Sequence, residues 1–320
     1  MLVERPGLQR VETDAGRAYV LTQLTGPVEV GDRVVLNTTA VGLGLGTGGW
    51  HVVHWNLSRE EWSEPGPGHI MKLRYTSLQV DTGAAEEEHP DLPADIDGMP
   101  VVVCGLHSQV PAVAVAILAA VPTARLAYVM TDGAALPIAL SDLVVDMVDA
   151  GLIAATITAG HAFGGDLEAV SVPSALALSR HVLAADVTVV AMGPGVVGTA
   201  TELGTSSVEV ASVLDSAAAM GGRPIAALRM SSGDERERHQ GVSHHSRTAL
   251  DLTRSPVLVA VPADVFHHDR HVVRVMAPPP MRELLQDAGL QVTTMGRSPE
   301  QDPLFFAAAG SAGALAAALL

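Results

Sequence analysis

Cysteine, lysine and aromatic residues are scarce in this chain of 320 residues. Cys104 is the single cysteine, which excludes an internal disulfide framework and any zinc site built from several thiolates. Lys72 is the single lysine, so a catalytic Schiff base or a P-loop lysine elsewhere is also excluded. Aromatic residues make up only 3% of the chain, which disfavours a pocket that stacks on a nucleobase.

Charge is low and strongly one-sided. Charged residues account for 17% of the chain and the formal net charge is −16, which argues against a nucleic-acid partner bound through a general basic surface. The composition does not exclude a local pocket of arginines. The N-terminus lacks the basic start and apolar run of a signal peptide, so we expect a cytoplasmic protein. Residues 304–320 carry no charge but are rich in alanine and glycine, which favours a buried closing helix over a membrane anchor.

The pattern of apolar segments predicts an α/β protein with a β-rich start. Residues 1–80 contain short β-prone runs broken by Gly-Pro and Gly-Asp, which indicates a small all-β barrel or sandwich. Residues 81–98 are acidic and contain prolines, as expected of an exposed linker. Over residues 99–320 apolar strands alternate with helical stretches, which predicts a mainly parallel sheet with helices on both faces. The predicted strands are 101–106, 125–130, 153–158, 187–192, 225–230 and 257–261.

A glycine loop follows one of these strands at the predicted carboxyl edge of the sheet, where parallel sheets bind ligands. Gly193, Gly195 and Gly198 fit the pattern G-x-G-x-x-G before a predicted helix over residues 201–220, and Thr199 adds a hydroxyl. Such a loop can bind an anion, or it can be a purely structural turn. A dinucleotide site is disfavoured, because no acidic residue ends a strand about twenty residues further on.

A histidine- and arginine-rich segment, residues 236–247, lies just beyond another strand end. Arg238 and Arg247 are candidates for anion binding, and His244 and His245 are candidates for acid–base chemistry. The structural alternative is a solvated helix start in which Ser243 is the N-cap of a helix that runs through Leu252. Further polar residues at strand ends belong to the same predicted site: His161 and Asp132 as catalytic candidates, and His107 and Ser108 as ligand-binding candidates.

Metal binding and serine hydrolysis are the alternative functions for these residues. A set of imidazoles and carboxylates from different strand ends could converge on a metal, but it has no fixed ligand spacing, so no metal site is predicted and the cofactor is left unassigned. This set comprises His107, His161, His244, Asp132 and Asp166. Ser108 lacks the flanking glycines of a nucleophile elbow. The second histidine cluster, residues 267–271, is predicted to be a solvated loop.

Two segments carry a resemblance to a known family. They are Gly-Pro-Gly-Val-Val-Gly-Thr-Ala-Thr-Glu-Leu-Gly from Gly193, and Arg-His-Gln-Gly-Val-Ser-His-His-Ser-Arg-Thr-Ala-Leu from Arg238. With these segments, and nearly end to end, the chain resembles an uncharacterised bacterial protein family of unknown function. The resemblance implies a β-rich start followed by an α/β body, and it lends no catalytic residues.

The sequence therefore predicts a small-molecule-binding protein or enzyme with an anion-binding site at the carboxyl edge of the parallel sheet. Whether it is an enzyme is left open. The expected partner is a small molecule with an anionic group, without nucleic acid or membrane, and a homo-oligomer is compatible with the sequence. The alternative is a non-catalytic assembly or regulatory module, since a fold alone does not fix a function.

Overall fold

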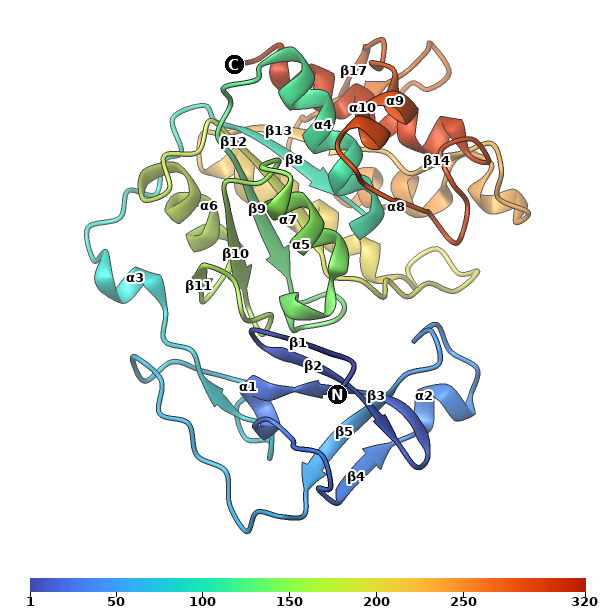
Figure 1. The fold of residues 1–320 in the computed structure, drawn as a ribbon. Helices are drawn as coiled ribbons and strands as arrows, with labels where there is room; N and C mark the ends of the chain where they lie inside the picture. The colour runs from blue at the N-terminus through green and yellow to red at the C-terminus, as the bar shows by residue number, and fades with distance from the viewer. The chain divides into compact units, whose positions relative to one another are not determined.

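A computed structural model describes residues 1–320 (Figure 1). The chain forms two compact units, Met1–Ala84 and Ala85–Leu320. Each unit has a hydrophobic core of its own.

The first unit is built on a small mixed sheet of five strands in the order β1-β2-β3-β5-β4. The strands are β1 (Val3–Arg5), β2 (Leu8–Thr13), β3 (Gly16–Leu21), β4 (Val34–Asn37) and β5 (His51–Asn56). The expected barrel or sandwich is absent, because β1 and β4 stay at opposite edges and nothing pairs them into a closed or second layer. Short elements complete the unit: α1 (Thr22–Thr25), α2 (Thr39–Gly42), and the pair β6 (Met71–Lys72) and β7 (Val80–Asp81).

The second unit contains an eight-stranded, entirely parallel sheet in the order β11-β10-β9-β12-β8-β13-β16-β17. This confirms the predicted α/β class. The two edge strands, β11 and β17, were not predicted, since they have only three and four residues and lack a buried apolar run. The strand bounds are β8 (Pro100–Cys104), β9 (Leu126–Thr131), β10 (Ala155–Ala159), β11 (Leu167–Ala169), β12 (Val187–Met192), β13 (Arg223–Ala227), β16 (Leu258–Val261) and β17 (Val272–Val275).

Helices cover both faces of this sheet, as the buried strands require. Alternate residues of β8 show the two faces: Val102 and Cys104 pack into one core, and Val101 and Val103 pack into the other. The first core contains α4 (Val110–Ala120), α5 (Asp142–Asp149), α9 (Met281–Asp287) and α10 (Pro303–Ala317). The second contains α6 (Val172–His181), α7 (Glu209–Ala219) and α8 (His244–Leu252).

The order of strands and helices creates a switch point between β8 and β13. These strands are neighbours, but α4 follows β8 onto one face whereas α8 follows β13 onto the other. The loops that leave the two strands therefore diverge, and ligands of open α/β sheets bind in the crevice that such divergence leaves. The candidate site is built at this place.

The acidic residues after the first unit pack against the second unit. Glu86 in α3 (Ala85–Glu88) accepts a hydrogen bond from the amide of Val170, and Ile96 is fully buried. The stretch 81–98, expected as an exposed linker, thus places its residues from 85 onward in the α/β unit.

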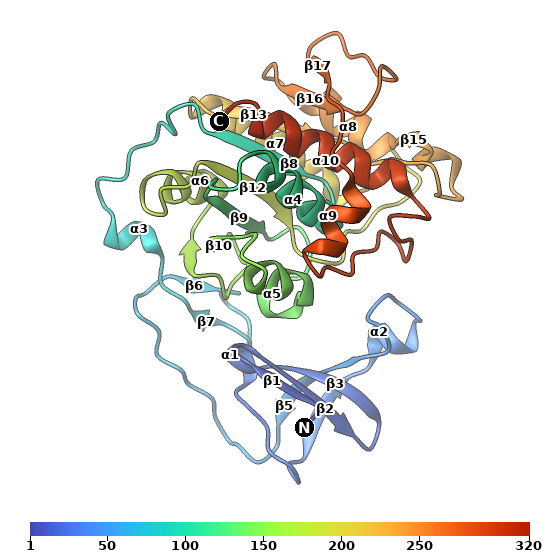
Figure 2. The same cartoon turned by 45° about the horizontal axis from the view of Figure 1, so that its top comes forward.

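The C-terminal helix α10 is buried and lies along α4 (Figure 2). Small residues allow this close approach: a Cβ added at Gly313 would lie 2.5 Å from the carbonyl oxygen of Val113 and 2.8 Å from Cβ of Ala116. The uncharged C-terminal segment is therefore a closing helix. None of the helices is long and apolar enough to cross a membrane.

We expect Gly313→Val to lower the free energy of unfolding by about 1–3 kcal/mol, because the side chain would push α10 away from α4. Ala314→Val is the matched control. It is the next residue of the same helix and is partly exposed, so only its helix propensity changes, by less than about 0.7 kcal/mol. Urea denaturation of both variants measures the difference, and an equal loss in the two would contradict the close-packing interpretation.

Candidate functional site

A loop that joins β13 to α8 carries the polar residues of the candidate site. Its base is a short antiparallel pair, β14 (Met230–Ser231) and β15 (Gly241–Val242), and between them lies a 3₁₀ turn over Glu237–His239. The amide of Ser243 donates to the carbonyl of Arg229, and the amide of Arg229 donates to Ser246 Oγ. The loop therefore returns to the carboxyl end of β13 just as α8 begins.

Buried charges hold this loop in place. The carboxylate of Asp234 is 2% exposed and pairs with Arg236 at 2.8 Å, Arg229 at 3.1 Å and Arg297 at 3.2 Å. The hydrogen bond from Arg236, together with the other arginine charges, holds the pKa of Asp234 well below its usual range. Burial lowers the pKa of Arg229 to about 10, which leaves its guanidinium charged at neutral pH.

A second buried carboxylate joins the loop to the C-terminal helix. Asp302 directly precedes α10 and accepts hydrogen bonds from Ser231 Oγ at 2.6 Å and from the Ser232 amide at 2.9 Å. Arg297 Nε also donates to Asp302, at 3.1 Å, so Arg297 bridges Asp302 and Asp234. The first part of the loop is thereby tied to the segment before α10.

Three histidines meet on this scaffold. The ring centroids of His244 and His245 lie 4.1 Å apart, and that of His239 lies 5.1 Å and 5.0 Å from them. His239 and His245 are buried, whereas His244 is partly exposed. Ser243 positions the group, since its Oγ accepts from the His245 amide at 3.3 Å and lies 2.8 Å from His239 Nδ1. The predicted N-cap role of Ser243 is confirmed.

All three imidazoles are uncharged at neutral pH. Burial, reinforced by the charges of Arg229 and Arg236, lowers the pKa of His239 to about 3. Burial and the neighbouring His244 lower the pKa of His245 to about 4. Burial and Arg238 lower the pKa of His244 as well. The cluster is therefore a set of neutral nitrogen donors and acceptors surrounded by positive charge.

The glycine loop reaches this cluster. A Cβ added at Gly198 would lie 2.5 Å from Cε1 of His245 and 3.1 Å from its Nε2, so only glycine lets the loop backbone rest on the imidazole. Gly193 packs similarly against the carbonyl of Ala135, whereas Gly195 has a φ of +103° and open space around it. The glycines therefore serve close packing and a turn.

The polar groups of the loop bond mainly to one another. The amide of Val197 donates to Ser206 Oγ at 3.2 Å, the amide of Thr199 donates to the carbonyl of Gly204 at 2.7 Å, and the hydroxyls of Thr199 and Thr201 lie 2.7 Å apart. No helix follows directly. The predicted helix over residues 201–220 is wrong in its first part, because a 3₁₀ turn over Ser206–Val208 precedes α7, which begins at Glu209. The loop thus lies beside the site, and the amides of Val197 and Thr199 are used internally.

The two candidate arginines differ in their surroundings. Arg238 lies in the 3₁₀ turn beside the histidines, and its buried Nε has no hydrogen-bond partner. Arg247 lies in α8 and is exposed, with its guanidinium 5.1 Å from the centroid of the Phe266 ring. Arg238 therefore lies at the histidine cluster, whereas the guanidinium of Arg247 lies over the Phe266 ring.

The remaining predicted residues form separate groups along the same edge. The ring nitrogens of His107 lie 3.1 Å from Tyr128 Oη and 2.7 Å from Ser141 Oγ, so both are engaged within the protein. The neighbouring Ser108 is partly buried in the 3₁₀ turn over His107–Gln109. Asp132 is exposed and accepts a hydrogen bond from the amide of His161 at 3.0 Å.

Asp166, part of the metal alternative, lies elsewhere. It accepts bonds from the amide and the hydroxyl of Thr156, near the amino end of β10, at 2.8 Å and 2.9 Å. The metal set weighed from the sequence is therefore not assembled. The second histidine cluster is also more buried than a solvated loop: the side chain of His267 is exposed, but His271 is buried and its Nε2 lies 2.8 Å from the carbonyl of Leu250.

Sequence reasoning missed three contributors. His239 stands five residues before His244, so the signal was three histidines within seven residues. Arg229 looked like part of a buried strand, because apolar residues surround it. Glu209 starts α7, accepts a hydrogen bond from Thr131 Oγ1 at the end of β9, and has its pKa raised by burial. Nothing in the local sequence marks Glu209 as a residue of this edge.

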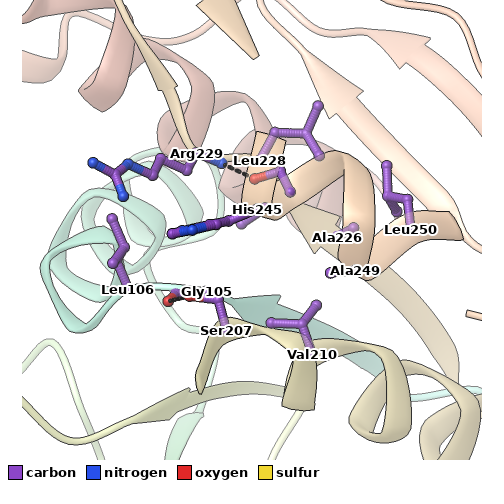
Figure 3. A pocket seen from close by; sticks show the side chains of 12 residues that line it. Gly105, Leu106, Ser207, Val210, Ala226, Leu228, Arg229, His245, Ala249 and Leu250 are labelled. Carbon is purple, nitrogen blue, oxygen red and sulfur yellow. Dashed lines mark hydrogen bonds between the residues drawn. The ribbon is translucent and has the colours of Figure 1, made fainter. Parts of the chain in front are cut away.

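A small cavity lies beside His245, between the carboxyl ends of β8 and β13. Figure 3 shows the His245 ring between the side chains of Leu106 and Arg229. The cavity has a volume of about 20 Å³, which is room for roughly one water molecule. A metabolite does not fit inside it.

Comparison with known proteins identifies a family. The chain belongs to the family DUF3866. The family is described as a protein of unknown function, and its model matches residues 17–313. The comparison with curated proteins found no match, and the comparison with solved structures found none either. The expected resemblance to a family of unknown function is confirmed, and the function must be argued from the site itself.

We expect Gly198→Ala to lower the free energy of unfolding by about 1–3 kcal/mol, because the added methyl would overlap the His245 ring. Gly46→Ala is the control, since a Cβ there meets nothing within 4 Å. Thermal or urea denaturation measures both. A neutral Gly198→Ala variant would show that the loop does not rest on His245.

The protein is expected to lose stability as the pH falls below about 6.5, because several histidines are neutral in the fold but bind protons when unfolded. His107 is one of them, since burial lowers its pKa to about 4. The contribution of neutral His107 to the free energy of unfolding is complete above about pH 6.5 and is lost as the pH falls toward 4. His107→Gln should therefore flatten the decline of unfolding free energy between about pH 6.5 and 5, measured in EDTA.

His267→Gln, at a side chain that is 85% exposed, should leave that pH dependence as it is in the parent protein. The slope that remains in His107→Gln belongs to His239, His244, His245 and His271, whose pKa values burial also lowers. Equal slopes in His107→Gln and in the parent protein would contradict the assignment.

Proposed function

We propose that this protein binds a small molecule through an anionic group, such as a phosphate or a carboxylate, at the switch point between β8 and β13. The observation that carries the proposal is the buried Nε of Arg238, which has no partner and lies beside two imidazoles whose Nε2 atoms are equally unpartnered. Unsatisfied buried polar groups are costly in a folded protein, and a ligand is one way in which they are satisfied.

The charge around the loop supports an anionic ligand. Among its buried and half-buried charged side chains, four arginines face two aspartates, and the two glutamates of the loop are exposed. In a protein whose net charge is −16, the buried and half-buried side chains of this corner carry a local excess of positive charge. The arginines are Arg229, Arg236, Arg238 and Arg297. Arginine is well suited to the task, because its planar guanidinium binds carboxylate and phosphate through two parallel hydrogen bonds.

The proposed roles differ between side chains. Arg238 contacts the anion, since its guanidinium is the one that Asp234 and Asp302 leave free. His244 is the one partly exposed imidazole of the cluster and is placed to exchange a proton with a bound molecule. Gly198 and the rest of the glycine loop form one wall, since Gly198 packs on the His245 ring and the amides of Val197 and Thr199 already donate within the protein. The proposal involves neither nucleic acid nor membrane.

We expect inorganic phosphate, pyrophosphate and citrate to stabilise the protein against heat beyond chloride at equal ionic strength. At a ligand concentration of 100 times Kd the stabilisation is about 2.7 kcal/mol. Arg238→Gln should weaken the effect by about tenfold or more, since it removes a charge-assisted hydrogen bond. Arg247→Gln is the matched control, because its guanidinium lies over Phe266 and should leave the effect unchanged.

The titrations use EDTA-treated protein in a buffer without oxyanions. Stabilisation that is absent for all three anions, or that is the same in Arg238→Gln and in the parent protein, would overturn the proposed site. Loss of the effect in both arginine variants would show that it arises from overall charge.

A further inference from the structure

The three histidines have the arrangement of a metal-ligand set. One ring nitrogen from each of His239, His244 and His245 lies within 4.8 Å of the others. A tetrahedral ion with metal–nitrogen bonds of about 2.0–2.1 Å needs its ligand atoms about 3.3 Å apart. Rotation of the side chains closes a difference of that size. The spacing of the ring nitrogens is therefore close to that of metal ligands, and the three rings are not hydrogen-bonded to one another.

The hydrogen bonds of the rings leave free the nitrogens that face a metal ion in a ligand set. The Nε2 atoms of His244 and His245 are buried and have no partner. The opposite nitrogens of two rings have partners: His239 Nδ1 lies 2.8 Å from Ser243 Oγ, and His245 Nδ1 lies 3.4 Å from Thr205 Oγ1. In metal sites the second ring nitrogen of a ligating histidine is usually bonded to the protein, which fixes the ring and its tautomer. Ser243 and Thr205 fill that position here.

The other histidine pair of the chain provides an internal contrast. The rings of His268 and His271 stack at 4.3 Å, nearly as close as those of His244 and His245. Yet their Nε2 atoms have partners, Asp251 at 3.2 Å and the carbonyl of Leu250 at 2.8 Å. Ring proximity alone thus does not require free nitrogens, and the free Nε2 atoms distinguish the cluster beside the glycine loop.

We propose that His239, His244 and His245 bind a divalent transition-metal ion, Zn²⁺ in the first instance, with a fourth coordination position open. Imidazole is a ligand for zinc, cobalt, nickel and copper, whereas magnesium and calcium require oxygen ligands, which this cluster lacks. Three protein ligands with an open position are the arrangement of catalytic rather than structural zinc sites. Neutral imidazoles also bind a metal without first losing a proton.

Nearby positive charge disfavours binding of the metal ion alone and favours an anion at its fourth coordination position. Arg238 and Arg229 are close enough to lower the pKa of both His244 and His245. A hydroxide, carboxylate or phosphate oxygen on the ion would offset this repulsion, and Arg238 would then bind the same anion. The inference therefore deepens the proposed function by adding a metal to its anion site, but the metal can be tested separately.

The first experiment adds Co²⁺ to the EDTA-treated full-length protein and records the visible absorption, with Zn²⁺ affinity measured by calorimetry. We expect the intense bands of four-coordinate cobalt, one ion per chain, and displacement by Zn²⁺. His244→Gln should weaken Zn²⁺ binding by more than about 100-fold, since loss even of an outer-shell partner costs 10–100-fold. His268→Gln is the matched control and should bind as the parent protein does.

His244 is the safest of the three positions to change, because it is partly exposed, and the melting temperature of the metal-free variant checks that it is folded. His239→Gln provides a second variant with the same expectation. No cobalt spectrum in the parent protein, a six-coordinate spectrum, or equal Zn²⁺ affinity in His244→Gln and His268→Gln would each overturn the metal site.

Phosphate titrations with and without Zn²⁺ separate this inference from the proposed function. If Zn²⁺ binds but phosphate stabilises neither form, the anion site fails and the metal site stands. If phosphate stabilises the metal-free protein through Arg238 but the cobalt experiment is negative, the metal site alone fails. If Zn²⁺ tightens phosphate binding, both are supported, because the anion then bridges the ion and Arg238.

Discussion

The buried carboxylate of Asp234 is the interaction on which the arrangement of the site depends. It gathers Arg229 from the end of β13, Arg236 from the loop and Arg297 from the segment before α10. The β13–α8 loop and the segment before α10, which are distant in the sequence, are thereby held at one point. Breaking a buried ion pair leaves an uncompensated charge, which costs about 3–5 kcal/mol, so this charge group specifies the loop conformation strongly. The histidines are placed by the loop that Asp234 fixes.

Much of the α/β unit could be predicted from local pattern, because its strands are buried on both faces and therefore read as continuous apolar runs. All six predicted strands of the sheet are present, and Ser243 caps α8 as its position before an amphipathic segment indicates. The edge strands β11 and β17 and the open form of the first sheet were not predictable in this way. An edge strand is short and partly exposed, and closure of a barrel depends on pairing between distant strands rather than on any one segment.

The site was only partly predictable, for a related reason. His244 and His245 stood out because their segment is rich in histidine and arginine, but His239 joins them only through the 3₁₀ turn over Glu237–His239 and the hydroxyl of Ser243. Arg247 matched Arg238 in sequence context, yet two residues along a helix place it on a different side from His245. The glycine pattern suggested an anion cradle, whereas the structure shows Gly198 packed on an imidazole. Side-chain direction, which short motifs do not encode, decided each case.

The surroundings of the three imidazoles keep them uncharged, and this determines what they can bind. Three imidazoles enclosed beside Arg229 and Arg238 cannot take up protons readily, so at neutral pH they keep lone pairs and N–H groups rather than charge. A buried carboxylate among them would have favoured the imidazolium form, but Asp234 is already occupied by three arginines. Burial, reinforced by the charges of nearby arginines, therefore keeps the histidines uncharged. Such a group is suited to the proposed metal site, in which the imidazole nitrogens bind the ion and the arginines attract the proposed anion.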